Sequence, residues 1–103
     1  EIFNLTKNFP KVESYSLTDQ IRRSSRSVSG NIAEAWGKRR YPKSFKYVLT
    51  TSEAEARETQ NWLDYAYACE YIEEKEHNLL DDKYDHIAAM LVKMITKPNK
   101  WTL

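Results

Sequence analysis

This chain of 103 residues has the size of one domain with one hydrophobic core, so residues 1–103 are expected to form a single domain. Its two glycines cannot supply a glycine-rich phosphate loop, and its single cysteine, Cys69, excludes an internal disulfide. The net charge is +1, but residues 1–46 hold ten Lys or Arg against four Asp or Glu, and residues 47–103 hold six against eleven. A basic half and an acidic half can present a patch to a polyanion, or attract each other within the fold or between subunits.

The composition also indicates fold class and location. Helix-favouring residues are abundant, glycine and proline are sparse, and no segment alternates apolar and polar residues, so an all-α chain is expected. No apolar run approaches the roughly 20 residues needed to cross a bilayer, and the first four residues lack the basic and apolar regions of a signal peptide. With only one cysteine, the chain is expected to be a soluble, cytoplasmic protein without a membrane partner.

The first segment has the pattern of a helix end. Apolar residues within 2–9 precede Pro10, and a helix is expected to stop before that proline. A helix that begins so late would be short, and Glu1 is not a methionine, so we expect the natural chain to extend upstream and the first helix to be truncated here. Residues 10–16 are expected to form a loop.

The second predicted helix runs from a capping-box-like start at Ser16 to a C-cap at Gly37. At about 100° per residue, an apolar face and an arginine face fall on opposite sides. The apolar face comprises Leu17, Ile21, Val28, Ile32 and Ala35, and the opposite face comprises Arg22, Arg23 and Arg26. The helix also contains several small residues, and these predict close packing against a neighbouring helix. They are Ser24, Ser25, Ser27, Ser29, Gly30 and Ala33.

A third helix is predicted from Pro42, which suits a first helical position. Its seam residues recur at alternating spacings of four and three, as in coiled coils. They are Phe45, Leu49, Ser52, Ala56, Thr59, Leu63, Ala66 and Glu70. Val48, Trp62 and Cys69 widen this seam, which predicts a neighbouring helix on each side and a buried, structural Cys69 thiol.

The acidic residues within 71–74 suit the start of a last helix, which Pro98 is expected to end. Its apolar positions again alternate by four and three: Leu80, Tyr84, Ile87, Leu91 and Met94. The expected architecture is therefore an all-α, up-and-down bundle of four helices with short connections, the first helix being incomplete.

Eight cations of the basic half are candidates for contacting the phosphates of RNA or DNA. They are Arg22, Arg23, Arg26, Lys38, Arg39, Arg40, Lys43 and Lys46. Trp36, Tyr41 and Tyr47 are close enough in sequence to stack on bases. The arginines could instead fix helix register or a subunit interface by pairing with Glu34, Glu53, Glu55 or Glu58. The run Lys38–Arg40 has no acid nearby in sequence and is the stronger candidate for phosphates.

Other polar positions have mainly structural interpretations. Asn31 lies at the margin of the apolar face, with Glu34 three residues later, and a register-setting hydrogen bond is favoured there over a polar binding site. The candidates for structural or interface roles are Asn31, Glu34, Glu55, Glu58 and Trp62.

The sequence favours neither a cofactor nor a catalytic site. Glu74 and His77 form one Glu-x-x-His, a spacing that di-iron bundles use on two helices together with further carboxylates. A single copy in the first turn of a helix, with His86 isolated, does not predict a metal site. No nucleophile is accompanied by a base, so we expect no enzyme and no cofactor.

Several segments carry a resemblance to a known family. They are Leu17–Ser25, Ser27–Ala35, Lys38–Tyr41, Ala54–Leu63 and Tyr71–Ile72. In these segments and in their spacing, the chain resembles the four-helix bundle proteins encoded in 23S rRNA intervening sequences, and the likeness extends from about Leu5 to Trp101. Ser24, Ser25 and Arg26 stand where the family often has Ala-Ala and an apolar residue, which places the chain in a sub-branch.

The resemblance implies more than the residues do. It implies a left-handed four-helix bundle, usually longer at the N-terminus, that assembles into a homo-oligomeric ring, typically a pentamer. A related branch, the accessory variability determinant proteins of diversity-generating retroelements, forms basic rings that work with a reverse transcriptase and nucleic acid. For most members of the family the role is unknown.

Three hypotheses remain open. The first, ranked slightly ahead, is a non-enzymatic homo-oligomeric ring that binds RNA or DNA by charge through the basic turn. The second is a protein-interaction scaffold whose charges serve assembly and which docks a reverse transcriptase or another protein. The third is a metal-dependent or other enzyme.

Overall fold

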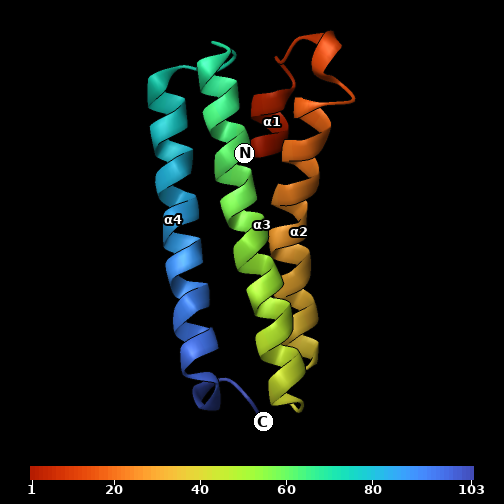
Figure 1. Cartoon of the computed structure of the whole chain (residues 1–103), viewed down its shortest axis with the longest axis vertical. Helices are drawn as coiled ribbons and strands as arrows, with labels where there is room; N and C mark the ends of the chain where they lie inside the picture. The colour runs from red at the N-terminus through yellow and green to blue at the C-terminus, as the bar shows by residue number, and fades with distance from the viewer.

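The computed structural model describes all 103 residues and contains helices but no strand. The helices are α1 (Ile2–Thr6), η1 (Lys11–Glu13), α2 (Leu17–Gly37), α3 (Pro42–Ala68), α4 (Glu74–Thr96) and η2 (Pro98–Lys100). The three long helices lie side by side along a body of 45 × 24 × 17 Å, with α2 and α4 running one way and α3 the other (Figure 1). The expectation of an all-α fold is confirmed. The handedness of the bundle and the truncation of the first helix stay predictions.

The helix α3 holds the fold together because it packs against both α2 and α4. No Cα atom of α2 lies within 8 Å of one in α4, and only the short α1 stands beside α2 on the remaining side (Figure 1). The predicted third helix with a neighbour on each side is therefore present. None of the helices combines the length and apolar character that a membrane-spanning segment needs.

Local chemistry explains where the helices begin and end. The first position of α3 is Pro42, and Pro98 follows the end of α4, as expected. A capping box opens α4, in which Glu73 and Glu76 each accept a bond from the other residue's backbone. Ser16 is the N-cap residue of α2, as expected, but its side chain makes no capping bond. Its hydroxyl donates to the Glu13 carboxylate, which also accepts the Leu17 backbone N–H at 3.4 Å.

Two predictions about the ends of α2 and α3 are wrong, the cap at Gly37 and the burial of Cys69. Gly37 is the last residue of α2 and does not adopt positive φ, so it is not a left-handed cap. The left-handed residue of this chain is Glu70, with φ 62°, which lies just beyond α3 and not in its seam. Because α3 ends at Ala68, Cys69 falls in the turn and is exposed, not buried.

The interface between α2 and α3 is narrow and partly polar. The hydroxyls of Ser24 and Thr59 share a hydrogen bond of 2.8 Å in the interior, and Ser52 donates to the Val28 carbonyl at 2.7 Å. These three side chains are fully buried, and small residues of this kind allow the two helices to approach closely. The seam predicted for α3 is confirmed apart from its last member.

Two apolar clusters lie at opposite ends of the bundle. The cluster beside α1 contains Ile2, Phe9, Leu17, Ile21, Leu63, Ala66, Ile72 and Leu80. The second cluster, at the end where α2 meets α3, contains Ala35, Phe45, Val48, Leu49 and Leu91. Since the second cluster joins α2, α3 and α4, it fixes the surface that those three helix ends form.

Candidate nucleic-acid interface

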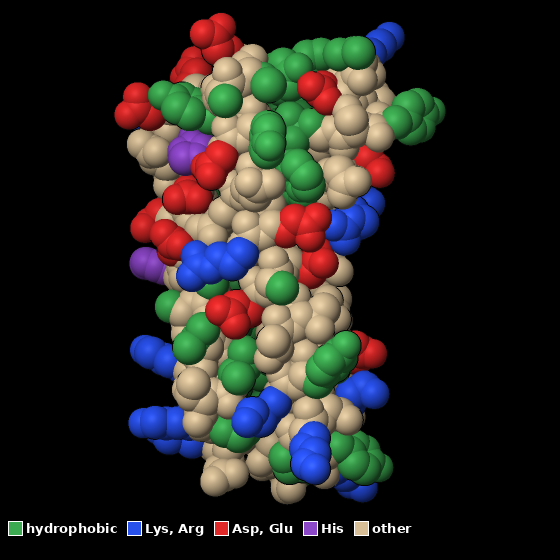
Figure 2. Space-filling view, viewed as in Figure 1, with side chains coloured by type: hydrophobic (Ala, Val, Ile, Leu, Met, Phe, Trp, Pro, Cys, Tyr) green, Lys and Arg blue, Asp and Glu red, His purple; other side chains and the backbone are tan.

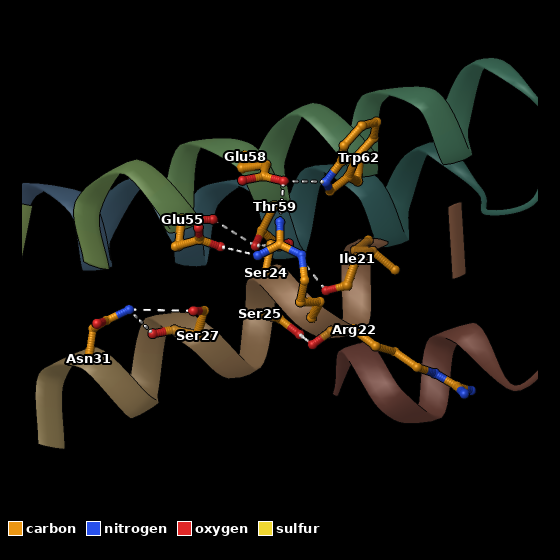
Figure 3. Close-up of polar contacts among 11 residues, drawn as sticks. Ile21, Arg22, Ser24, Ser25, Ser27, Asn31, Glu55, Glu58, Thr59 and Trp62 are labelled. Carbon is orange, nitrogen blue, oxygen red and sulfur yellow. Dashed lines mark hydrogen bonds and ion pairs between the residues drawn. The ribbon is translucent and has the colours of Figure 1, made fainter. Parts of the chain in front are cut away.

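Among the predicted basic residues, Arg23 is paired and not free. Its guanidinium bonds Glu55 at 3.3 Å and Glu58 at 2.5 Å across the α2–α3 interface (Figure 3). The Trp62 indole donates to the same Glu58 carboxylate at 3.3 Å. The hydrogen bond that Arg23 donates to the Glu58 carboxylate raises the pKa of Arg23. Pairing with glutamates was one of the two roles expected for the arginines. For Arg23 this pairing links two helices of one protomer.

The neighbouring arginines lie against α1. Arg22 donates through Nε to the Thr6 hydroxyl at 2.7 Å, and its guanidinium carbon lies 4.5 Å from the centre of the Phe3 ring. Arg26 stands over the same ring at 5.9 Å. The expectation that all three arginines project from a free outer face is therefore wrong for Arg22, which is half-buried. Sequence periodicity could not show where the short α1 would pack.

The remaining residues predicted for structural roles act locally. Asn31 is half-buried, and its amide donates to the Ser27 carbonyl of its own helix at 2.8 Å (Figure 3). It does not set register with another helix within the chain. Glu34 is exposed and forms no ion pair. In contrast, Glu55, Glu58 and Trp62 belong to the network around Arg23.

Residues 38–46, which we call the basic turn, comprise the connection between α2 and α3 and the start of α3, and their cations are not paired as Arg23 is. The five cations of this turn, none of which forms an ion pair, are Lys38, Arg39, Arg40, Lys43 and Lys46. Arg39 is positioned by Trp36, because its Nε donates to the Trp36 carbonyl at 3.0 Å and its guanidinium lies 4.0 Å from the indole ring. The other four charged groups have no intramolecular carboxylate partner, so they remain available to an external anion.

Three lysines from the C-terminal part of the chain, which were not among the predicted site residues, lie at the same end of the bundle as this turn. Because α4 runs antiparallel to α3, its last residues return to the same end of the bundle, and the Leu103 backbone N–H donates to the Arg39 carbonyl at 3.0 Å (Figure 1). The lysines are Lys93, Lys97 and Lys100, and none of them forms an ion pair. The expected up-and-down topology could have identified these lysines, because it places the end of α4 beside the turn between α2 and α3.

We call this surface the basic end, formed by residues 35–52 and 86–103. These two segments contain eight Lys or Arg and no Asp or Glu. At the opposite end, residues 64–82 contain seven Asp or Glu and one Lys. Figure 2 shows acidic side chains gathered towards the top of the molecule and basic ones at the bottom. The charge is thus divided between the ends of the bundle, and not simply between the two halves of the sequence.

His77 of the Glu-x-x-His pattern lies near two aspartates in the structure, and not near Glu74 as a metal ligand. His77 meets Asp64 at 2.7 Å, and one ligand atom each of His77, Asp64 and Asp81 lies within 4.8 Å of the others. Glu74, the acid of the Glu-x-x-His spacing, is not part of this group. Asp64 is largely exposed, and an ion pair between α3 and α4 accounts for the contact without a metal.

The ion pair predicts how stability depends on pH. The hydrogen bond to Asp64 raises the pKa of His77 above its ordinary value, so the protonated form is favoured in the folded state. Its contribution is therefore present below about pH 6.5 and is lost as pH rises through the folded pKa. We expect His77→Gln to destabilise the fold more at about pH 5.5 than at about pH 8.5, by less than about 1 kcal/mol, in urea unfolding.

The matched control for this prediction is His86→Gln. His86 lies on the same helix, is exposed and makes no hydrogen bond within the chain. Its replacement is expected to leave the pH dependence of unfolding unchanged. An equal loss for His77→Gln at both pH values would contradict the ion pair.

Comparison with known proteins places this geometry in a family. The sequence profile of the family described as 23S rRNA-intervening sequence protein matches residues 1–93. The chain belongs to this family. A solved structure with a similar fold is that of a protein with unknown function from the S23 ribosomal protein family of Bacteroides thetaiotaomicron. It is 26% identical, with a TM-score of 0.79, and the match covers 90% of this chain and 83% of that one. A search of curated proteins finds no match.

The family match covers only part of the basic end. The 23S rRNA-intervening sequence profile includes the basic turn and ends at Lys93, so Lys97 and Lys100 lie beyond the matched residues. The Arg23 network and the two helices it joins lie wholly within the match. The resemblance stated from the sequence is confirmed at the level of the family.

Proposed function

We propose that this 23S rRNA-intervening sequence protein binds nucleic acid through its basic end, with no enzymatic activity and no strong preference for sequence. The observation that supports this most strongly is the set of eight cations without ion pairs, on two segments without a single Asp or Glu. Phosphates are the natural counter-charge for such a surface, because cations that displace counterions from a polyanion gain affinity without reading bases.

Helix electrostatics support an external partner. Cations near the C-terminal ends of α2 and α4 are favourable to those helices, so Lys93 and Lys97 need no partner to explain them. The N-terminus of α3 lies at the same end, however, and its first turn contains Lys43 and no acid. A cation there opposes the helix dipole and costs a few tenths of a kcal/mol. An anion bound between these helix ends would offset that cost.

Self-assembly would strengthen the same activity. We include in the proposal the homo-oligomeric ring, typically pentameric, that the family resemblance implies. Several copies with their basic ends on one face would present a larger field to one strand, so weak contacts would combine into a higher avidity. Arg23, Glu55 and Glu58 pair with one another within the protomer, so their charges are balanced before assembly.

The experiment is a salt series with a short labelled RNA. Affinity is expected to fall as salt rises, with log K decreasing by about 0.7 per phosphate contacted for a single strand. RNAs of different sequence and equal length should bind alike. Absence of binding at low salt, or affinity that does not change with salt, would remove the proposal.

A second candidate function follows from the charge separation itself. The basic end of one copy complements the acidic end of another, and such head-to-tail contacts build assemblies that do not need nucleic acid. This would make the chain a scaffold whose charges serve assembly and which docks another protein. Sedimentation should then show salt-sensitive self-association, lost when Glu70, Glu74 and Asp82 are replaced together by lysine.

A further inference from the structure

The basic end carries exposed aromatic rings among its cations. Trp36 is 46% exposed, Tyr41 64% and Tyr47 74%. All three fall within residues 36–47, together with the five cations of the basic turn. Tyr47 also lines a shallow hollow with Lys38 and Lys43, to which Glu34 contributes one acidic side chain. Proteins that bind unpaired bases combine exposed aromatic rings, on which the bases stack, with cations that contact the phosphates.

Two of the three rings, Tyr41 and Tyr47, have no aromatic or cationic partner within the chain, whereas the Arg39 guanidinium lies over Trp36 at 4.0 Å. Tyr65 lies against Trp62 with ring centres 5.7 Å apart, and Tyr67 lies against His77 at 5.2 Å. Tyr41 and Tyr47 contact no other ring and no cation over their faces. Their faces are therefore unoccupied, and an exposed, unpartnered ring gains most from a stacked base.

We infer that the ligand of the basic end is a single-stranded nucleic acid, whose phosphates meet the lysines and arginines while its bases stack on Tyr41 and Tyr47. This inference rests on the proposed function and specifies the ligand class. In a duplex the faces of the bases are already stacked on one another, so an aromatic ring cannot stack on them. In a single strand each base offers a free face, and stacking adds to the charge interaction without selecting a sequence.

The test compares single strands with a duplex. The probes are an oligouridylate and an oligothymidylate of about 12 nucleotides, and an RNA duplex of the same length, each fluorescently labelled. The wild type should bind both single strands more tightly than the duplex, because neither stacking nor phosphate contact requires the 2′-hydroxyl. Tyr41→Ala with Tyr47→Ala should weaken single-strand binding by about tenfold or more and leave duplex binding nearly unchanged.

Three controls separate stacking from other effects. Tyr41→Phe with Tyr47→Phe keeps both rings and should bind like the wild type. Tyr15→Ala removes a tyrosine that is 98% exposed but lies before α2, at the far end of the bundle, and should change nothing. Circular dichroism should show the same helix content for every variant, since the replaced rings are exposed.

The outcomes distinguish this inference from the proposed function. If the duplex binds as tightly as both single strands, or if the double alanine variant keeps full single-strand affinity, stacking is overturned while charge-driven binding stands. If none of the three probes binds at low salt, the proposed function fails and the ligand class fails with it.

Discussion

Replacing Lys38, Arg39 and Arg40 together by glutamate is expected to lower the affinity for single-stranded RNA by about 100-fold or more at low salt. The reason is that none of the three cations forms an ion pair, so no carboxylate of the chain neutralises their charge. Three lost phosphate contacts should also reduce the slope of log K against log salt by roughly two. Fluorescence anisotropy across a salt series measures both quantities.

The control variant also replaces three cations by glutamate, so its net charge changes by the same amount, but at the opposite end of the bundle. Lys7, Lys11 and Lys75 are exposed and lie at the end of the bundle away from the basic turn. Replacing these three by glutamate should weaken binding only slightly, because exposed charges farther away than a Debye length of about 10 Å are largely screened. Equal losses in the two triple variants would mean that net charge, and not the basic end, governs binding.

The largest effect on stability is expected for Phe45→Ala, at about 3–5 kcal/mol. Phe45 is fully buried in the cluster that joins α2, α3 and α4 beneath the basic end, with Leu49 and Leu91. Truncating it removes apolar contacts and leaves a cavity that three helices cannot close without moving. Urea unfolding followed by circular dichroism gives the free energy, and it should be measured at two protein concentrations in case subunits stabilise one another.

The matched variant for stability is Tyr47→Ala, two positions along the same helix. Tyr47 is largely exposed, so its loss should change the free energy of unfolding by no more than about 0.5 kcal/mol. A cost below about 1 kcal/mol for Phe45→Ala would contradict the packing of this cluster. A large cost for Tyr47→Ala would show that its ring is covered, which would also remove it as a stacking surface.

Sequence patterns were most informative where a local rule fixes the backbone. The prolines at 42 and 98 place a helix start and a helix end, and the four-three spacing after Phe45 identifies the buried seam of α3. The same reasoning failed at the end of that seam. Periodicity continues to Glu70, but the helix stops at Ala68, so Cys69 was wrongly expected to be buried.

The candidate site was less predictable because it depends on contacts between distant segments. The sequence identifies Arg23 as a cation, but only the register of α2 against α3 decides that it meets Glu55 and Glu58. Likewise, Lys97 belongs to the acidic half of the sequence, but the return of the C-terminal segment to Arg39 places it at the basic end. The basic turn was identifiable in advance because its five cations are local in sequence and no acid lies near them.

The central claim, that nucleic acid binds at the basic end, is tested most directly by mapping where a strand lies on the protein. Ultraviolet cross-linking of a bound oligouridylate, followed by mass spectrometry of the peptides, identifies the contacted residues. We predict cross-links within residues 36–47 and 93–101 and none within residues 64–82. Cross-links confined to the arginines of α2, or spread over the acidic end, would contradict it.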